Sequence, residues 1–361
     1  MRTLNWYIIR GFLLTFGMAI VVLTFVMTGA NLIKAMDFLM RGVPFKTFLE
    51  FTLCLLPIAL TFTVPWAVLV GVMLVFGRLS ADSEITAMRA CGVSILQIMA
   101  PILLITFLLT CFCLYLQVEV GPPLLGRSRE LSTETILNTP EAIFEPGKPL
   151  VYDSAAISIV DKRPDGTLTG VQIYQMDKRG EMALDISAAT AKLRVDHEQR
   201  RLIIQLFDCL LVDKKSKPEI RNAHAELEFG FDYGKELNRI RLAVRPKFMT
   251  LRNLMAYIKI ERMMNHSTIE EEIELNQRIA FALAPMAFLL LGMPLAIRAS
   301  RKETSVGLFM SVILAGFFFL SIIICESLGN FPQIYPQYLL WLPNIIFQVL
   351  GAVMIYRISQ R

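Results

Sequence analysis

Residues 51–77 read FTLCLLPIALTFTVPWAVLVGVMLVFG and contain no Asp, Glu, Lys or Arg. An α-helix needs about 20 apolar residues to cross the hydrocarbon layer of a bilayer, and a charge near its middle is costly. Five further stretches share this composition: residues 11–33, 93–118, 279–297, 306–325 and 338–356. With a hydrophobic content of 55%, the set predicts six transmembrane helices rather than buried helices of a soluble protein.

A polar block, residues 119–278, separates the third stretch from the fourth. The sequence therefore predicts an α-helical membrane protein of six transmembrane helices with a domain inserted between helices 3 and 4. We expect transmembrane helices 1–3 in residues 1–118, the inserted domain in residues 119–265 and transmembrane helices 4–6 in residues 266–361.

The distribution of Lys and Arg predicts the orientation, because loops on the cytoplasmic side are enriched in these residues. With the N-terminus inside, the loop between the last two spans lies outside and has no basic residue. The inserted domain is then also outside. Three residues of the first outer loop run against the rule: Lys34, Arg41 and Lys46. The basic residues that agree with the rule, because they fall on the cytoplasmic side, are Arg2, Arg10, Arg78, Arg89, Arg298, Arg301, Lys302, Arg357 and Arg361.

The inserted domain has the pattern of an all-β structure. Strand-like runs cover residues 151–160, 168–176, 191–195 and 202–212, and Pro164-Asp165-Gly166 indicates a hairpin between the first two. A sandwich, a jelly roll and an open barrel all fit this spacing. Residues 250–264 then predict a helix, and Ser267 with Glu270 predicts a capping box for the next one.

Motifs for catalysis or metal binding are missing from the sequence. It has no G-x-x-x-x-G-K-[ST] loop for ATP phosphates and no G-x-S-x-G elbow, and its three histidines are scattered outside any H-E-x-x-H motif. A net charge of +5 does not indicate nucleic-acid binding. We therefore expect no catalytic residue, no metal site and no cofactor.

The inner loop between the second and third spans carries the sequence RLSADSEITAMRACGVS, residues 78–94. Asp82 or Ser80 could cap a short helix at about residues 80–92, and Gly92 would end it. On this helix Glu84 and Met88 share a face, with Ile85 and Arg89 beside them. Physical reasoning leaves two alternatives equally open: a solvated connector resting on lipid headgroups, or a coupling helix that docks on a cytoplasmic partner.

This loop resembles that of the LptF/LptG (YjgP/YjgQ) family of lipopolysaccharide export system permeases. So do Arg278 followed by LLLGMPLA at residues 289–296, and WLPNIIF at residues 341–347. The resemblance covers essentially the full length. It implies a periplasmic β-jelly-roll domain in a protein of the bacterial inner membrane, with both termini in the cytoplasm. The inner loop favours the LptF type over the LptG type.

The resemblance also implies partners and residue roles. It implies a heterodimer with a sister permease, a cytoplasmic ATPase dimer (LptB), LptC on the periplasmic side, and lipopolysaccharide as the substrate. Glu84 matches the acidic residue of the coupling helix, which favours docking for Glu84, Ile85, Met88 and Arg89. Lys34, Arg41 and Lys46 become candidates for the lipid phosphates, the alternative being ordinary contact with phospholipid headgroups. Glu326 is either an end charge of the fifth span or a gate-side partner of a basic group such as Lys34.

We therefore expect a permease subunit of an ATP-driven exporter that extracts lipopolysaccharide and passes it to a periplasmic bridge. Pulling one acyl chain of about 12 carbons from a bilayer costs about 10 kcal/mol, at about 0.8 kcal/mol per CH₂. A multi-acylated lipid therefore needs an energy source. Two alternatives remain: export of another amphiphile such as a lipoprotein or glycolipid, and a membrane-anchored scaffold that transports nothing.

Overall fold

The computed structural model describes residues 2–40, 45–138, 150–152, 155–163, 167–176, 182–196, 201–213, 220–232, 246–299, 304–328 and 335–360. The chain divides into two compact units. A membrane unit contains Met1–Met36, Phe48–Arg129 and Arg245–Arg361, and a β unit contains Asp37–Thr47 and Glu130–Val244.

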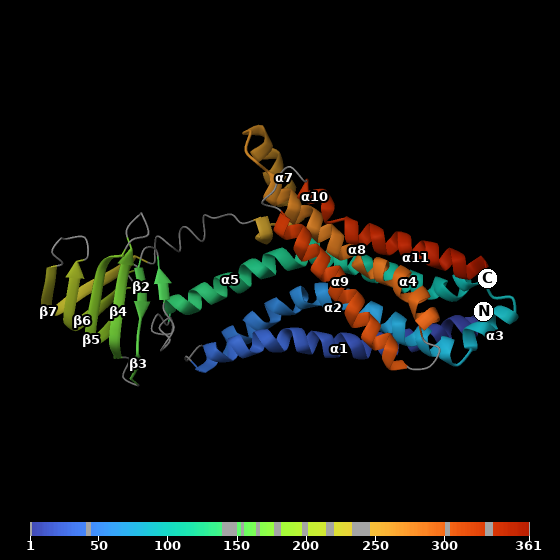
Figure 1. Ribbon diagram of the computed structural model, residues 1–361, viewed down its shortest axis with the longest axis horizontal. Helices are drawn as coiled ribbons and strands as arrows, with labels where there is room; N and C mark the ends of the chain where they lie inside the picture. The colour runs from blue at the N-terminus through green and yellow to red at the C-terminus, as the bar shows by residue number, and fades with distance from the viewer. Residues whose placement is uncertain are drawn as a thin grey trace. The chain divides into compact units, whose positions relative to one another are not determined.

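Six helices in the described part of the chain are long and apolar enough to cross a membrane, which confirms the six predicted spans. The first two are α1 (Arg2–Met40) and α2 (Phe45–Ala81). The third runs through α4 (Ile95–Tyr115), the π-helix η1 (Leu116–Val120) and α5 (Gly121–Asn138). The last three are α8 (Ile269–Ala299), α9 (Thr304–Ser327) and α11 (Leu342–Gln360), the last preceded by α10 (Pro336–Leu339). Figure 1 shows these helices side by side.

The core of the membrane unit lies between α2 and α8. In the most apolar window of each span, 72% of the residues of α2 and of α8 are buried, against 6% in α1 and 22% in α9. The Phe288 ring of α8 meets the Phe318 ring of α9 edge-on at 4.8 Å between centroids, and Phe347 of α11 lies 5.3 Å from Phe318. Of the six spans, α1 and α9 therefore present the largest uncovered apolar surfaces to lipid or to another chain.

The helix α11 packs closely on α8 because Gly351 has no side chain. A Cβ at this position would lie 2.5 Å from the backbone carbonyl of Leu290, closer than real Cβ atoms approach. Small residues at such crossings allow transmembrane helices to approach each other. Polar groups add to the contact, since the Asn344 amide donates to the Ala280 carbonyl at 2.8 Å and the Trp341 indole donates to Asn276 at 3.0 Å.

The β unit contains one antiparallel sheet with the strand order β1-β2-β4-β5-β6-β7, and β3 pairs with β4. Its strands are β1 (Leu150–Tyr152), β2 (Ala155–Ser158), β3 (Asp161–Lys162), β4 (Leu168–Met176), β5 (Met182–Asp196), β6 (Arg201–Asp213) and β7 (Ile220–Asp232). One row of side chains crosses the sheet: Ile157 faces Ile173, which faces Ile186, and all three are buried. Alternate residues thus form the core of this unit, and the predicted fold class is confirmed.

Two local predictions change in detail, and a third lies outside the described residues. The run 151–160 is not one strand, because β1 and β2 pair with each other before β2 pairs with β4. The Pro164–Gly166 turn lies outside the described residues, although β3 and β4 on either side of it pair antiparallel. The predicted Ser267 cap is wrong: α8 begins at Ile269, and the Glu272 N–H donates to the carbonyl of Thr268, so Thr268 precedes the helix.

The compact β unit is shorter than the predicted range of 119–265. At its start, the helix of the third span continues through η1 and α5 to Asn138, well beyond residue 118. At its end, the 3₁₀ turn η3 (Pro246–Phe248) and the helix α7 (Leu251–Met263) belong to the membrane unit. The helix α7 confirms the helix predicted for residues 250–264. It packs against α8 and belongs to the membrane unit rather than to the β unit.

Candidate functional site

The short helix α3 (Glu84–Ala90) forms where the inner loop was predicted to carry a coupling helix. It is shorter than 80–92 because α2 continues to Ala81. Neither Asp82 nor Ser80 caps it: the residue before it is Ser83, with φ of 58° and no capping hydrogen bond from its side chain. The Ser80 hydroxyl instead donates to the carbonyl of Ile297 at 2.9 Å and joins the ends of α2 and α8.

Gly92 ends α3 as predicted, through a Schellman motif. Its φ of 85° lies in the left-handed region that glycine adopts without strain. The Gly92 N–H donates to Arg89 at 2.9 Å and the Val93 N–H donates to Met88 at 3.1 Å. These two bonds satisfy the last carbonyls of the helix and fix the direction in which the chain leaves it.

One side of α3 belongs to the core of the membrane unit. The Ile85 side chain is 6% exposed and packs in the same cluster as Leu79 of α2 and Ile8 of α1, and Met88 packs against that cluster. Thr86 and Ala87, on other sides of the helix, are exposed. The helix is therefore held firmly from one side and open on another, unlike a connector lying loosely on headgroups.

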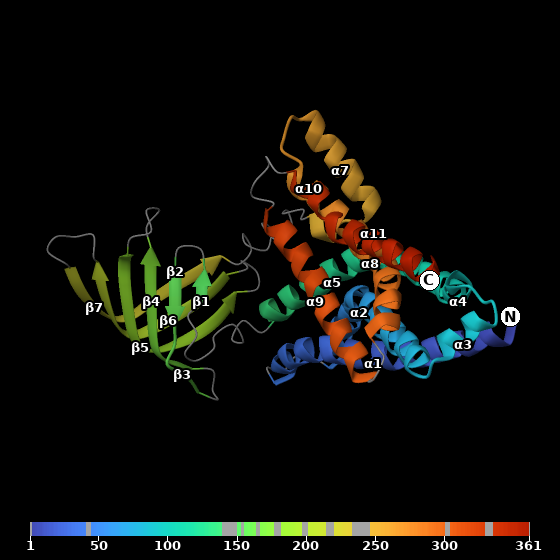
Figure 2. The same ribbon diagram turned by 45° about the vertical axis from the view of Figure 1, so that its right-hand side comes forward.

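Glu84 is the first residue of α3 and is tied to α1. The Tyr7 hydroxyl donates to the Glu84 carboxylate at 3.1 Å. Figures 1 and 2 show α3 next to the start of α1, at the end of the bundle where both chain termini lie. Arg89 is half-buried on the same helix.

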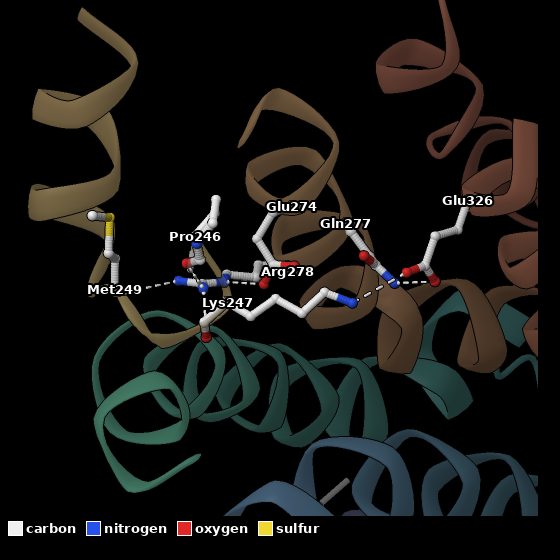
Figure 3. A network of polar contacts seen from close by, with 7 residues as sticks. All are labelled: Pro246, Lys247, Met249, Glu274, Gln277, Arg278 and Glu326. Carbon is white, nitrogen blue, oxygen red and sulfur yellow. Dashed lines mark hydrogen bonds and ion pairs between the residues drawn. The ribbon is translucent and has the colours of Figure 1, made fainter. Parts of the chain in front are cut away.

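A second polar cluster surrounds Arg278 near the other end of α8. The Arg278 side chain is 4% exposed, and its Nε donates to Glu274 at 2.8 Å. Its terminal nitrogens donate to three backbone carbonyls in and beside η3: Met249 at 2.6 Å, Pro246 at 3.0 Å and Lys247 at 3.1 Å (Figure 3). One guanidinium thus fastens η3, the segment that follows the β unit, to α8, and its planar fork of donors suits several acceptors at once.

Lys247 extends this cluster to α9. Its ammonium lies 3.5 Å from the Glu326 carboxylate at the end of α9, and the Gln277 amide of α8 donates to the same carboxylate at 3.0 Å (Figure 3). A half-exposed pair of this kind is weak and is easily exchanged for other partners. Glu326 therefore has partners within its own chain.

A cavity of about 180 Å³ lies beside the cluster. Apolar side chains of α2, α5 and α8 line it together with the polar end groups: Ile58, Phe62, Leu125, Phe281, Gln117 and Lys247. Gln117 belongs to η1, and π-helical turns of this kind are frequent at functional sites. The lining also includes Thr61, Gln277 and the ion pair of Arg278 with Glu274, so the cavity joins an apolar wall to a polar end with charges of both signs.

The chain matches the family described as lipopolysaccharide export system permease LptF/LptG over residues 6–357. It belongs to this family. The match includes both the α3 loop and the Arg278 cluster, and it makes the chain a multi-pass inner-membrane transport component rather than a catalytic one. No curated protein matches the sequence.

The structure of this LptF/LptG permease brings some of the predicted site residues together and leaves others outside the described residues. Glu84, Ile85, Met88 and Arg89 come together on α3. Lys46 is exposed near the start of α2, whereas Arg41 and the side chain of Lys34 lie outside the described residues. The roles assigned to all of these residues remain predictions.

Sequence reasoning did not assign a role to Arg278 or Lys247. An arginine at the head of an otherwise charge-free span was the available signal for Arg278, because such a charge needs partners. No comparable signal marked Lys247, whose partners Glu326 and Arg278 are distant in sequence.

Proposed function

We propose that this chain is one of two related permease subunits of an ATP-driven lipopolysaccharide exporter. In this proposal it pairs with a sister permease, a cytoplasmic ATPase dimer (LptB) drives both, and LptC receives the lipid on the periplasmic side. The proposal rests on membership of the LptF/LptG family. The helix α3 supports it, because one side of this helix is buried in the bundle and another side is exposed. The apolar sides of α1 and α9 would face the sister subunit or the lipid.

The docking element in this proposal is α3. Its Ile85 side is embedded in the helix bundle, so a push on its open side would be passed to α1, α2 and α8. Glu84 would supply the charge that a basic or N–H group of the ATPase recognises. Arg41, Lys46 and Lys34 would meet the lipid phosphates at the outer surface.

The test of this function is recovery of the tagged chain from membranes in mild detergent. We expect a sister permease, an ATPase and bound lipopolysaccharide to be recovered with it. A complex that holds another lipid or a lipoprotein would identify a different exporter. Recovery of the chain without any nucleotide-binding subunit would favour the scaffold and contradict the proposal.

The proposed orientation has a natural reporter in Cys91. This thiol is exposed at the end of α3, whereas Cys209 of the β unit is buried. A membrane-impermeant maleimide should therefore label the chain in inside-out vesicles and leave it unlabelled in intact spheroplasts. The Cys91→Ser variant is the control and should stay unlabelled in both. Labelling of Cys91 in spheroplasts would reverse the topology.

A further inference from the structure

The hydrogen bond from Tyr7 to Glu84 joins two segments that lie 77 positions apart in the sequence. Tyr7 belongs to the first turns of α1, and Glu84 begins α3. No sequence motif indicates this contact. It connects the proposed ATPase-docking helix directly to a transmembrane helix that has little other contact with the bundle.

The start of α1 is the part of that helix that the bundle holds. Ile8 and Phe12 are 1% and 0% exposed, and the Phe12 ring packs so closely on Gly71 of α2 that an added Cβ would lie 3.1 Å from it. Farther along, large side chains face outward, with Met18 and Phe25 65% and 72% exposed. A bond between Thr24 and Thr63 is a second, neutral tie to α2. The contacts of α1 nearest to α3 therefore lie within residues 7–12.

The chemistry of the bond makes it a suitable link. A phenol that donates to a carboxylate forms a charge-assisted hydrogen bond, which is stronger than a neutral one. The Tyr7 side chain is nevertheless 45% exposed, so water and approaching groups can reach the bond. A partner that binds Glu84 therefore binds a carboxylate that the Tyr7 hydroxyl already orients. A displacement of this carboxylate would pull on α1 through the same hydrogen bond.

We propose that Tyr7 is a positioning residue of the exporter. Its hydroxyl orients Glu84 for the ATPase and makes α1 follow α3 when the ATPase changes conformation. This inference rests on the proposed function, because it requires Glu84 to be the docking residue. It adds a residue and a route by which movement reaches the first transmembrane helix.

The experiment compares Tyr7→Phe, Glu84→Gln and the double variant in the complete complex reconstituted in proteoliposomes. ATP hydrolysis and lipopolysaccharide release are measured on the same samples. Tyr7→Phe keeps the ring and removes only the hydroxyl. Tyr356→Phe is the matched control, because Tyr356 is a similarly exposed tyrosine whose hydroxyl accepts a hydrogen bond from Gln360 of the same helix, α11.

We expect Tyr7→Phe to assemble normally and to release about threefold to tenfold less lipopolysaccharide per ATP, which is the effect of losing a hydrogen bond of ordinary strength. The exposure of Tyr7 to water reduces the additional strength that the charge would give. Tyr356→Phe should behave as wild type. The double variant should be no worse than Glu84→Gln, because both changes remove the same contact.

Three results would overturn the inference. If Tyr7→Phe transports normally while Glu84→Gln does not, Tyr7 has no role and the proposed function stands. If the two effects multiply and the yield of Tyr7→Phe falls, the tyrosine only stabilises the fold. If Glu84→Gln itself transports normally, the proposed docking site fails and this inference fails with it.

Discussion

Replacement of Glu84 by Ala should abolish lipopolysaccharide export while the permease complex still assembles. The change removes the one carboxylate of α3 and leaves Ile85 in the core, so the helix keeps its place. Removing one partner of a charge pair at an interface costs about 2–5 kcal/mol, which corresponds to at least about thirtyfold weaker docking of the ATPase on α3. Export is measured as lipopolysaccharide released from proteoliposomes, and assembly by co-purification of the ATPase.

Asp82→Ala is the matched control for this prediction. Asp82 is exposed two residues before α3, so the variant changes the charge at the same end of the molecule without touching Glu84. We expect it to export normally. Normal export by Glu84→Ala would show that the carboxylate is not used, as a non-transporting scaffold would predict.

Replacement of Arg278 by Ala should destabilise the membrane unit more than any other single polar change described above. The variant leaves Glu274, which is 14% exposed, without its ion-pair partner, and it removes a donor from three backbone carbonyls. Of these three, the Pro246 carbonyl still accepts a hydrogen bond from the Met249 N–H at 3.2 Å. Breaking a buried pair from one side costs about 3–5 kcal/mol. The midpoint of thermal unfolding in detergent should fall by about 5 °C or more, given the usual scaling with protein size.

In Arg278→Ala, the segment around η3 should unfold locally under conditions in which the rest of the membrane unit is still folded. Limited proteolysis should cut Arg278→Ala faster than wild type near η3, because that segment loses its fastening to α8. Arg278→Lys should recover only part of the stability, since an ammonium lacks the planar fork that serves several acceptors. Arg252→Ala, a change at an exposed arginine of α7, is the control and should leave both measurements unchanged. An unchanged cleavage rate in Arg278→Ala would contradict the role assigned to the cluster.

The membrane part of the fold could be predicted from the sequence because its signal is one of composition. Six charge-free stretches are visible without any knowledge of packing, and Gly92 marks the end of α3 through its backbone freedom alone. The inserted domain was predictable as β, but the break between β1 and β2 was not, since the residues 151–160 read as one apolar run. The strand β7 follows β6 with charged residues on its outer face and was not predicted.

The contacts of the two sites were harder to predict than their residues. Glu84 was found by its place in a loop, but Tyr7 could not be assigned to it, because a tyrosine near the start of a transmembrane helix is common at the membrane surface. The pairing of Glu326 with Lys247 likewise depends on how α9 packs against η3. These two segments are far apart in the sequence, and no sequence pattern indicates that they are in contact.

The three carbonyls that Arg278 holds belong to the backbone and would be there whatever side chains accompany them. Changes in the side chains of residues 247 and 249 should therefore leave these three hydrogen bonds to α8 in place, provided that the backbone keeps its turn. A library that randomises residues 247 and 249 should retain most folded variants, whereas one that randomises residue 278 should retain almost none. Divergence in this segment among related permeases is thus compatible with an unchanged attachment of η3 to α8.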